Sequence, residues 1–202
     1  MTNFTDQTLK QYLQELSSEK PVPGGGSVSA YVAALAMGLT QMVGRISLKR
    51  KPKQGLSAED LRKDQEKRAE IQKVIDSLEK PKQDAFQVVD LDPKVYESVM
   101  QSYGDPAKLE DALKNSFRLQ ADLALLTVMA RRAANAIAGL VSGSIKNDLV
   151  VSAHLLEAAF QGAYHTAMIN VVYMKDAGEK KRSEKALEEL KAKFEKEKSH
   201  AG

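Results

Sequence analysis

The sequence contains no cysteine and no tryptophan, and only 5% of its residues are aromatic. Without cysteine the chain has no disulfide, no thiolate nucleophile and no cysteine-ligated zinc or iron–sulfur site. This composition fits a cytoplasmic protein. The formal net charge is only +3, from 30 basic and 27 acidic residues, so no overall basic field marks the chain as a dedicated nucleic-acid-binding protein.

Two further patterns are missing from the sequence. Residues 1–19 carry charged and polar residues throughout, without the apolar core of a signal peptide. Sustained strand-like alternation is also absent. Residues 28–48 are long enough to span a membrane, but they include Gln41, Arg45 and many small residues, which favour the central helix of a soluble bundle. We therefore expect no membrane partner.

What is present is a series of helical patterns separated by short breaks, which predicts an all-α, up-and-down helical bundle. The expected helices are 5–18 with Thr5 as N-cap, 28–48 with Ser27 as N-cap, 57–79 ended by Pro81, one that opens with Asp92 as N-cap and Pro93 as first residue, 107–140, and a last one from Gly143 to Met174. The helix at 28–48 is apolar on nearly every side, so either the bundle or a second subunit must cover it.

The domain organisation follows from a change of composition near Gly178. Residues 1–177 are expected to form one helical domain. Residues 178–202 are rich in lysine and glutamate, with a thin apolar stripe made by Leu187, Leu190 and Phe194. We expect this segment to be a charged C-terminal helical tail that docks weakly.

The most informative motif is Pro21-Val22-Pro23-Gly24-Gly25-Gly26-Ser27, directly before the apolar helix. Glycine loses more backbone freedom on folding than any other residue, so three in a row indicate that the backbone passes close to something. Free N–H groups at a helix start can also hold an anion. The alternative is a tight turn before a buried helix, and the lysine of a P-loop is missing.

This motif and the Ala/Leu/Met/Gly-rich helix behind it resemble the start of the cyclodeaminase/cyclohydrolase family of folate one-carbon enzymes, which includes the C-terminal domain of formiminotransferase-cyclodeaminase. The similarity runs from about residue 4 to about residue 176. It implies an all-helical homodimer that acts on a tetrahydrofolate derivative, without a further cofactor or a metal. The reaction would be that of formimino-tetrahydrofolate cyclodeaminase or methenyl-tetrahydrofolate cyclohydrolase, which the sequence does not distinguish.

The resemblance also assigns roles to individual residues. Five of them would shape the folate pocket: Pro23, Gly24, Gly25, Gly26 and Ser27. The family carries an acidic residue, taken to be catalytic, four positions before an aromatic residue and ahead of Val-Met and Tyr. Asp84 stands only two positions before Phe86, whereas Asp92 has Tyr96, Val99-Met100 and Tyr103 at every expected spacing. Asp92 is therefore the predicted catalytic acid/base, although an aspartate before proline is also an ordinary helix N-cap.

Polar and small side chains recur on one face of the last predicted helix. They are Asp148, Ser152, Leu155, Ala159, Gly162, Thr166 and Asn170. Such a stripe is either a buried hydrogen-bond network between helices or the lining of a site. The resemblance places Asp148 and Asn170 near the folate. Lys49, in the densest basic cluster, could attract the glutamate tail of folate, or could belong to a solvated helix end.

Two alternatives stay open at this point. Several asparagines that the family usually carries are replaced, which allows a non-catalytic folate-binding or structural helical dimer. On another face of the last predicted helix, His154 and Glu157 have the spacing of metal ligands, but no partner helix supplies a matching motif. A solvated or dimer-facing polar stripe is the preferred interpretation there, and we predict no metal site.

Overall fold

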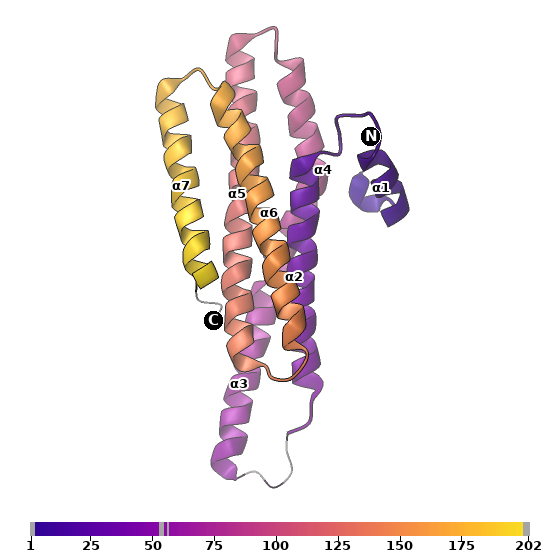
Figure 1. Ribbon diagram of the computed structural model, residues 1–202, viewed down its shortest axis with the longest axis vertical. Coiled ribbons are helices and arrows are strands. Elements are labelled where there is room, and N and C mark those ends of the chain that lie inside the picture. The colour runs from indigo at the N-terminus through magenta and orange to yellow at the C-terminus, as the bar shows by residue number, and fades with distance from the viewer. Residues whose placement is uncertain (1–2, 53–54, 56, 200–202) are drawn as a thin grey trace.

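The computed structural model describes residues 3–52, 55 and 57–199, and every regular element in these ranges is a helix (Figure 1). The elements are a short 3-10 helix η1 (Phe4–Asp6), α1 (Leu9–Leu16), α2 (Gly25–Lys49), α3 (Ala58–Ser77), α4 (Glu79–Gln101), α5 (Pro106–Leu140), α6 (Lys146–Tyr173) and α7 (Ala177–Ser199). The predicted all-α class is confirmed.

Four long helices make the centre of the bundle. Helices α2 and α5 each pack on both α4 and α6, so the four close a ring. Successive helices run in alternate directions, with α3 and α4 forming one rising arm, as Figure 1 shows. Helix α7 lies outside the ring on α5 and α6. Helix α3 packs on α2 and α5 near the C-terminal ends of those two helices. This is the predicted up-and-down bundle.

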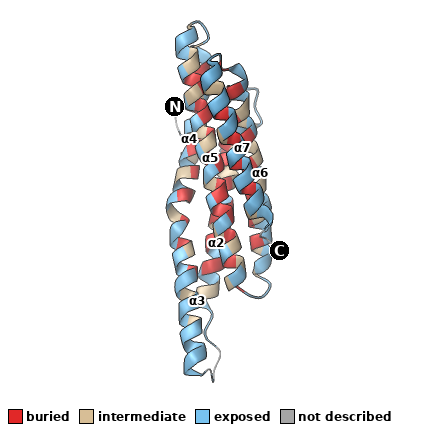
Figure 2. Ribbon diagram, turned by 90° about the vertical axis from the view of Figure 1, so that its left-hand side faces the viewer, coloured by how far each residue is buried: buried red, intermediate tan, exposed pale blue. Residues whose placement is uncertain are grey.

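Helix α2 has the central position expected from its composition. Ala30, Ala33 and Ala36 are fully buried, because small side chains let the neighbouring helices approach closely. Figure 2 shows buried residues along the faces where the long helices meet, whereas α3 is mostly exposed. Both α2 and α5 are long and apolar enough to cross a membrane by length and composition alone, and 61% and 44% of their most apolar windows are buried within the bundle.

The first helix begins later than predicted. Thr8, not Thr5, is its N-cap: the Thr8 hydroxyl accepts from the Gln11 N–H, and the Gln11 side chain accepts from the Thr8 N–H. Thr5 belongs to η1, and its N–H and hydroxyl both donate to the Asp90 carboxylate on α4. The predicted cap is wrong because Thr5 has a partner 85 residues away, which a local pattern does not reveal.

The break between α3 and α4 falls at Leu78, and Pro81 does not end the preceding helix. Proline is instead the third residue of α4, where its missing N–H would have no partner inside the helix. Ser57 caps α3 as predicted, accepting from the Asp60 N–H.

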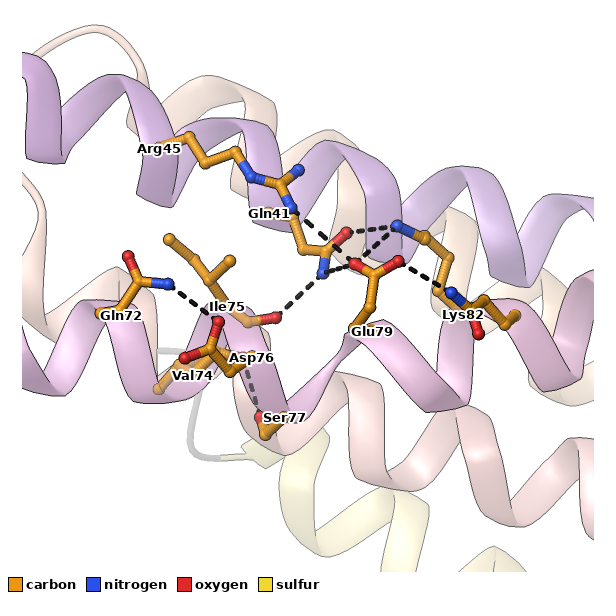
Figure 3. Close-up of polar contacts among 10 residues, drawn as sticks. Gln41, Arg45, Gln72, Val74, Ile75, Asp76, Ser77, Glu79 and Lys82 are labelled. Atoms are coloured by element: carbon orange, nitrogen blue, oxygen red, sulfur yellow. Dashed lines mark hydrogen bonds and ion pairs between the residues drawn. The ribbon is translucent and has the colours of Figure 1, made fainter.

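A buried amide from α2 fixes this break. Gln41 is fully buried, and its Nε2 donates to the Ile75 carbonyl at 2.9 Å and to Glu79 Oε2 at 3.0 Å. Lys82 Nζ donates to Gln41 Oε1 at 2.9 Å and to Glu79 Oε2 at 3.0 Å (Figure 3). The network satisfies a carbonyl in the last turn of α3 and ties both parts of the arm to α2.

Helix α7 is buried more deeply than its thin stripe predicts. Leu187 and Phe194 are fully buried, and the Phe194 ring stacks on Phe160 of α6 with ring centroids 4.2 Å apart. The Tyr164 hydroxyl donates to Glu188 at 3.1 Å. The segment after Gly178 is therefore packed firmly on α5 and α6.

This packing predicts that Phe194→Ala lowers the free energy of unfolding by about 3 kcal/mol or more, because it removes a stacked, buried ring and leaves a cavity. Urea denaturation followed by circular dichroism measures the loss. Phe86→Ala is the matched control, since Phe86 is 38% exposed. A loss for Phe194→Ala no larger than that for Phe86→Ala would contradict the predicted contribution of the Phe194 ring to the core.

Candidate functional site

The glycine motif leads directly into α2. The Val22–Pro23 peptide bond is cis, Gly24 is the N-cap with an extended backbone, and the helix begins at Gly25. Ser27 was predicted to be the cap, but it lies in the first helical turn and is fully buried. That prediction is wrong because the glycines themselves take up the helical backbone, and the serine hydroxyl has a partner on another helix.

The carboxylate of Asp92 lies against this first turn. The Ser27 N–H donates to Asp92 Oδ2 at 3.0 Å, and Gln120 Nε2 of α5 donates to Asp92 Oδ1 at 2.7 Å. A Cβ atom on Gly26 would lie 2.6 Å from the Asp92 carboxyl carbon, and closer still to Asp92 Oδ1 and Gln120 Nε2. The close approach inferred from the three glycines is therefore to a side chain of the chain itself, and only glycine leaves room for it at position 26.

Asp92 and Pro93 lie inside α4, so their predicted roles as N-cap and first helical residue are wrong. An interior proline has no N–H to donate to the carbonyl four residues earlier, here that of Val89. The Ser27 hydroxyl donates to this carbonyl at 2.9 Å and replaces the missing partner. Ser27 therefore binds α4 twice, through its N–H to Asp92 and through its hydroxyl to Val89.

The electrostatics of the site centre on two groups. Burial raises the pKa of Asp92 above its ordinary value, and the hydrogen bonds from Ser27 and Gln120 oppose that rise. Burial likewise raises the pKa of Tyr12, whose hydroxyl lies 3.2 Å from the Ser27 hydroxyl. Since the single Ser27 hydroxyl hydrogen goes to Val89, Tyr12 is the donor in that contact. A half-buried carboxyl group with a raised pKa is suited to giving and taking a proton.

Gln120 is a site residue that the sequence did not reveal. It is fully buried, and its Oε1 has no hydrogen-bond partner among the described residues. With the amide turned over, Oε1 would accept a hydrogen bond from a protonated Asp92. The side chain therefore fits both protonation states of the carboxyl group. Gln120 shares the buried face of α5 with Ser116, Thr127 and Arg131, so its polarity alone does not distinguish it in the sequence.

The predicted polar stripe on α6 packs against α2. The Ser152 hydroxyl lies 2.8 Å from that of Thr40, and Gly162 lies close to the Ser29 side chain, where its own Cβ would be 3.1 Å from that of Ser29. These members of the stripe form the hydrogen-bonded interface between two helices, one of the two expected roles. At the glycine end of the bundle, Thr166 lies next to Gly25, with its Oγ1 3.9 Å from the position of a Cβ there.

The remaining predicted ligand contacts are divided between the two ends of the bundle. Asn170 is buried on the same helix as Thr166, and its amide donates to the Thr166 carbonyl at 2.8 Å. Asp148 is in the first turn of α6, about 33 Å from Asn170 along the helix axis. Lys49 is the last residue of α2, about 36 Å from Gly25. Within one chain, Lys49 and Asp148 do not reach the Asp92 site.

No cluster of three or more metal-ligating side chains occurs within the described ranges. Asp84, the rejected catalytic candidate, forms an ion pair with Lys80 on the surface of α4. Asp92 is the carboxylate that the first turn of α2 and Gln120 hold in place.

Comparison with known proteins identifies relatives of this chain. The formimidoyltransferase-cyclodeaminase of Mus musculus is 24% identical over 185 residues, which cover 86% of this chain and 32% of that protein. The Sus scrofa protein of the same name is 25% identical over 174 residues, covering 81% of this chain and 30% of its own length. The chain thus spans about a third of the length of these curated relatives.

Structural comparison shows the same fold in a crystal structure. The formiminotetrahydrofolate cyclodeaminase of Thermotoga maritima superposes with a TM-score of 0.86 at 23% identity, over 97% of this chain and 94% of the other. Residues 8–189 match the profile of the formiminotransferase-cyclodeaminase family, a span that reaches into α7. The resemblance deduced from the glycine motif is confirmed: the chain belongs to the formiminotransferase-cyclodeaminase family.

Proposed function

We propose that the protein is a cytoplasmic folate one-carbon enzyme that acts on the formimino or methenyl bridge of tetrahydrofolate, as a cyclodeaminase or a cyclohydrolase. Family membership and the cyclodeaminase names of its relatives support this function. The observation that carries it is the Asp92 carboxylate, half-buried and held by the Ser27 N–H and Gln120 beside the glycine turn. Tetrahydrofolate is the substrate, and the chemistry needs neither a further cofactor nor a nucleic-acid or membrane partner.

Asp92 is the acid/base in either reaction. In cyclodeamination N10 of the folate bonds to the formimino carbon already held by N5, the bond from that carbon to the departing nitrogen breaks, and the proton that N10 loses is passed to that nitrogen, which leaves as ammonia. In cyclohydrolysis water adds to the methenyl carbon and loses a proton, and one carbon–nitrogen bond of the bridge then breaks as its nitrogen takes up a proton, which leaves a formyl group on the other nitrogen. The carboxylate serves both steps, and its charge also stabilises the cationic methenyl carbon. The backbone from Pro23 to Ser27 forms the wall of the pocket, with Asn170 at the same end of the bundle.

Asp92→Asn is expected to reduce activity at least about a hundredfold, because the amide cannot exchange the proton. Absorbance of 5,10-methenyl-tetrahydrofolate measures this, supplied as substrate in one assay and formed from 5-formimino-tetrahydrofolate in the other. Asp84→Asn, on the surface of the same helix, should leave activity unchanged. Equal activity of Asp92→Asn and wild type would refute the catalytic role and favour a non-catalytic folate-binding dimer.

The same substitution should not destabilise the fold. The raised pKa means that the folded state binds a proton at Asp92 more tightly than the unfolded state does, so this carboxyl lowers stability as pH rises from its ordinary pKa through its raised value. An asparagine keeps an acceptor for the Ser27 N–H, and its amide hydrogens can reach the unpartnered Gln120 Oε1. We expect a stability equal to wild type or higher by about 1 kcal/mol at neutral pH, measured by urea denaturation.

Gly26→Ala tests the close approach of Asp92. The new Cβ would overlap the carboxyl group and Gln120, so we expect a loss of about 2 kcal/mol of unfolding free energy together with a loss of activity. Gly139→Ala is the control, because nothing lies within 4 Å of its Cβ position and alanine favours the helix. If Gly26→Ala and Gly139→Ala have the same free energy of unfolding and the same turnover, the position of the Asp92 carboxylate does not depend on the space that glycine leaves at position 26.

We also propose that the enzyme is a homodimer whose second copy covers the outer face of α2 and α6. Leu35 is 51% exposed and Ile169 is 51% exposed, and each belongs to an uncovered apolar stripe. The stripe on α2 consists of Leu35, Met42 and Ile46, and that on α6 of Val151, Ile169 and Val172. Gly38 lies inside the first stripe with open space at its Cβ position, which would allow two α2 helices to approach closely.

A second copy packed antiparallel to the first would bring together the predicted ligand contacts that lie at opposite ends of one chain. Helices α2 and α6 lie side by side and run in opposite directions along the bundle (Figure 1). A twofold axis across their outer face would bring the Lys49 and Asp148 end of one copy to the Gly25 end of the other. Each active site would then combine Asp92 of one subunit with Asp148 of its partner.

Leu35→Glu should convert the dimer into monomers in light scattering after size exclusion, because it buries a charge in the interface. Leu61→Glu, at an exposed position of α3, is the control. Mixing two inactive variants, Asp92→Asn and Asp148→Asn, should restore about a quarter of wild-type activity, since half of the mixed population carries one intact site. Absence of any restoration after subunit exchange would show that the two aspartates do not share a site across subunits.

A further inference from the structure

A groove of about 640 Å³ lies between α5, α6 and the C-terminal part of α7. Its polar wall consists of Arg131, Asn135, Lys146, His154, Glu157 and Lys198. Small and aliphatic residues of α5 and α6 form the rest. Arg131 follows Gln120 by eleven residues on α5, so the near end of the groove lies about 16 Å from Gln120 along the helix axis. The predicted polar face of α6 with His154 and Glu157 therefore borders a cavity.

Arg131 is the unusual member of this wall. It is only 5% exposed, its Nη1 donates to the Ala153 carbonyl at 3.1 Å, and its Nε has no hydrogen-bond partner among the described residues. No carboxylate within the described ranges forms an ion pair with it. A buried charge is expensive unless an opposite charge and hydrogen bonds compensate it. The guanidinium thus lacks an anion in the isolated chain.

The single carboxylate of the groove does not fill this role. Glu157 is bound by Lys198 of α7, and the hydrogen bond from Lys198 lowers the pKa of Glu157, with Arg131 contributing less. Lys146, the first residue of α6, has no ion pair among the residues that the structure describes, and it lies at the positive end of the helix dipole. Three cations therefore face one carboxylate, and that carboxylate is already occupied.

We propose that this groove is a binding site for a small anion that carries more than one phosphate group. Arg131 is its buried anchor, because a guanidinium presents a planar fork of donors to phosphate oxygens. Lys146 lies about 10 Å along α6 from the level of Ala153, where Arg131 is anchored, so one phosphate does not meet both cations. This spacing selects a ligand with two or more phosphates. The site is independent of the folate function proposed above.

Calorimetric titration of the full chain with pyrophosphate, at constant ionic strength, tests the proposal. We expect one site per chain in wild type and an affinity at least tenfold weaker in Lys146→Glu. Lys181→Glu makes the same charge change at an exposed position of α7, outside the groove, and should leave the affinity unchanged. Arg131→Gln should abolish binding while the protein stays folded, since it removes an unpaired buried charge.

The outcomes separate this site from the folate site and from general attraction of anions. Asp92→Asn should bind pyrophosphate as wild type does, even if it has lost all turnover. Equal weakening by Lys146→Glu and Lys181→Glu would mean a diffuse electrostatic effect and would overturn the proposal. So would an absence of binding heat in wild type, or pyrophosphate affinity unchanged in a folded Arg131→Gln variant.

Discussion

The hydrogen bonds between the first turn of α2 and the interior of α4 are the constraint on which the site depends. Ser27 supplies two of these bonds. Its N–H donates to the Asp92 carboxylate, and its hydroxyl donates to the Val89 carbonyl, which receives no N–H from Pro93. The absent side chain at Gly26 provides the space, and Gln120 completes the seat from α5. Three helices of the central ring thus meet at one carboxyl group, so its position is as rigid as the bundle.

That carboxyl group is a local cost to the fold. It lies where burial disfavours its charge, beside an amide oxygen without a partner. A neutral side chain of the same shape would satisfy the surroundings better. Stability alone would select against the arrangement, and the proposed catalytic role would account for it.

Helical periodicity and composition were sufficient to predict the all-α bundle, the long helices α5 and α6, and the central place of α2. The three wrong helix caps have one common cause, because each concerns a side chain whose partner is distant in sequence. Thr5, Ser27 and Asp92 all have the residue type of a helix cap, yet each one bonds to a different element. Gln120 escaped notice for the same reason, since its role exists only once α4 and α5 are packed together. The family resemblance predicted Asp92 because it rests on the spacing of a whole motif. Such a motif reflects contacts between distant residues as well as local structure.

The link between Ser27 and Pro93 also ties together two positions that stand 66 residues apart in the chain. Any other residue at position 93 would return an N–H to the Val89 carbonyl, which would then have two donors in place of one. A serine at position 27 is useful because of the proline, and the proline is harmless because of the serine. The two positions are therefore not equally free to change: replacing Pro93 alone only adds a second donor, which a carbonyl oxygen with two lone pairs can accept, whereas replacing Ser27 alone leaves the Val89 carbonyl without a donor and the Tyr12 hydroxyl without its acceptor.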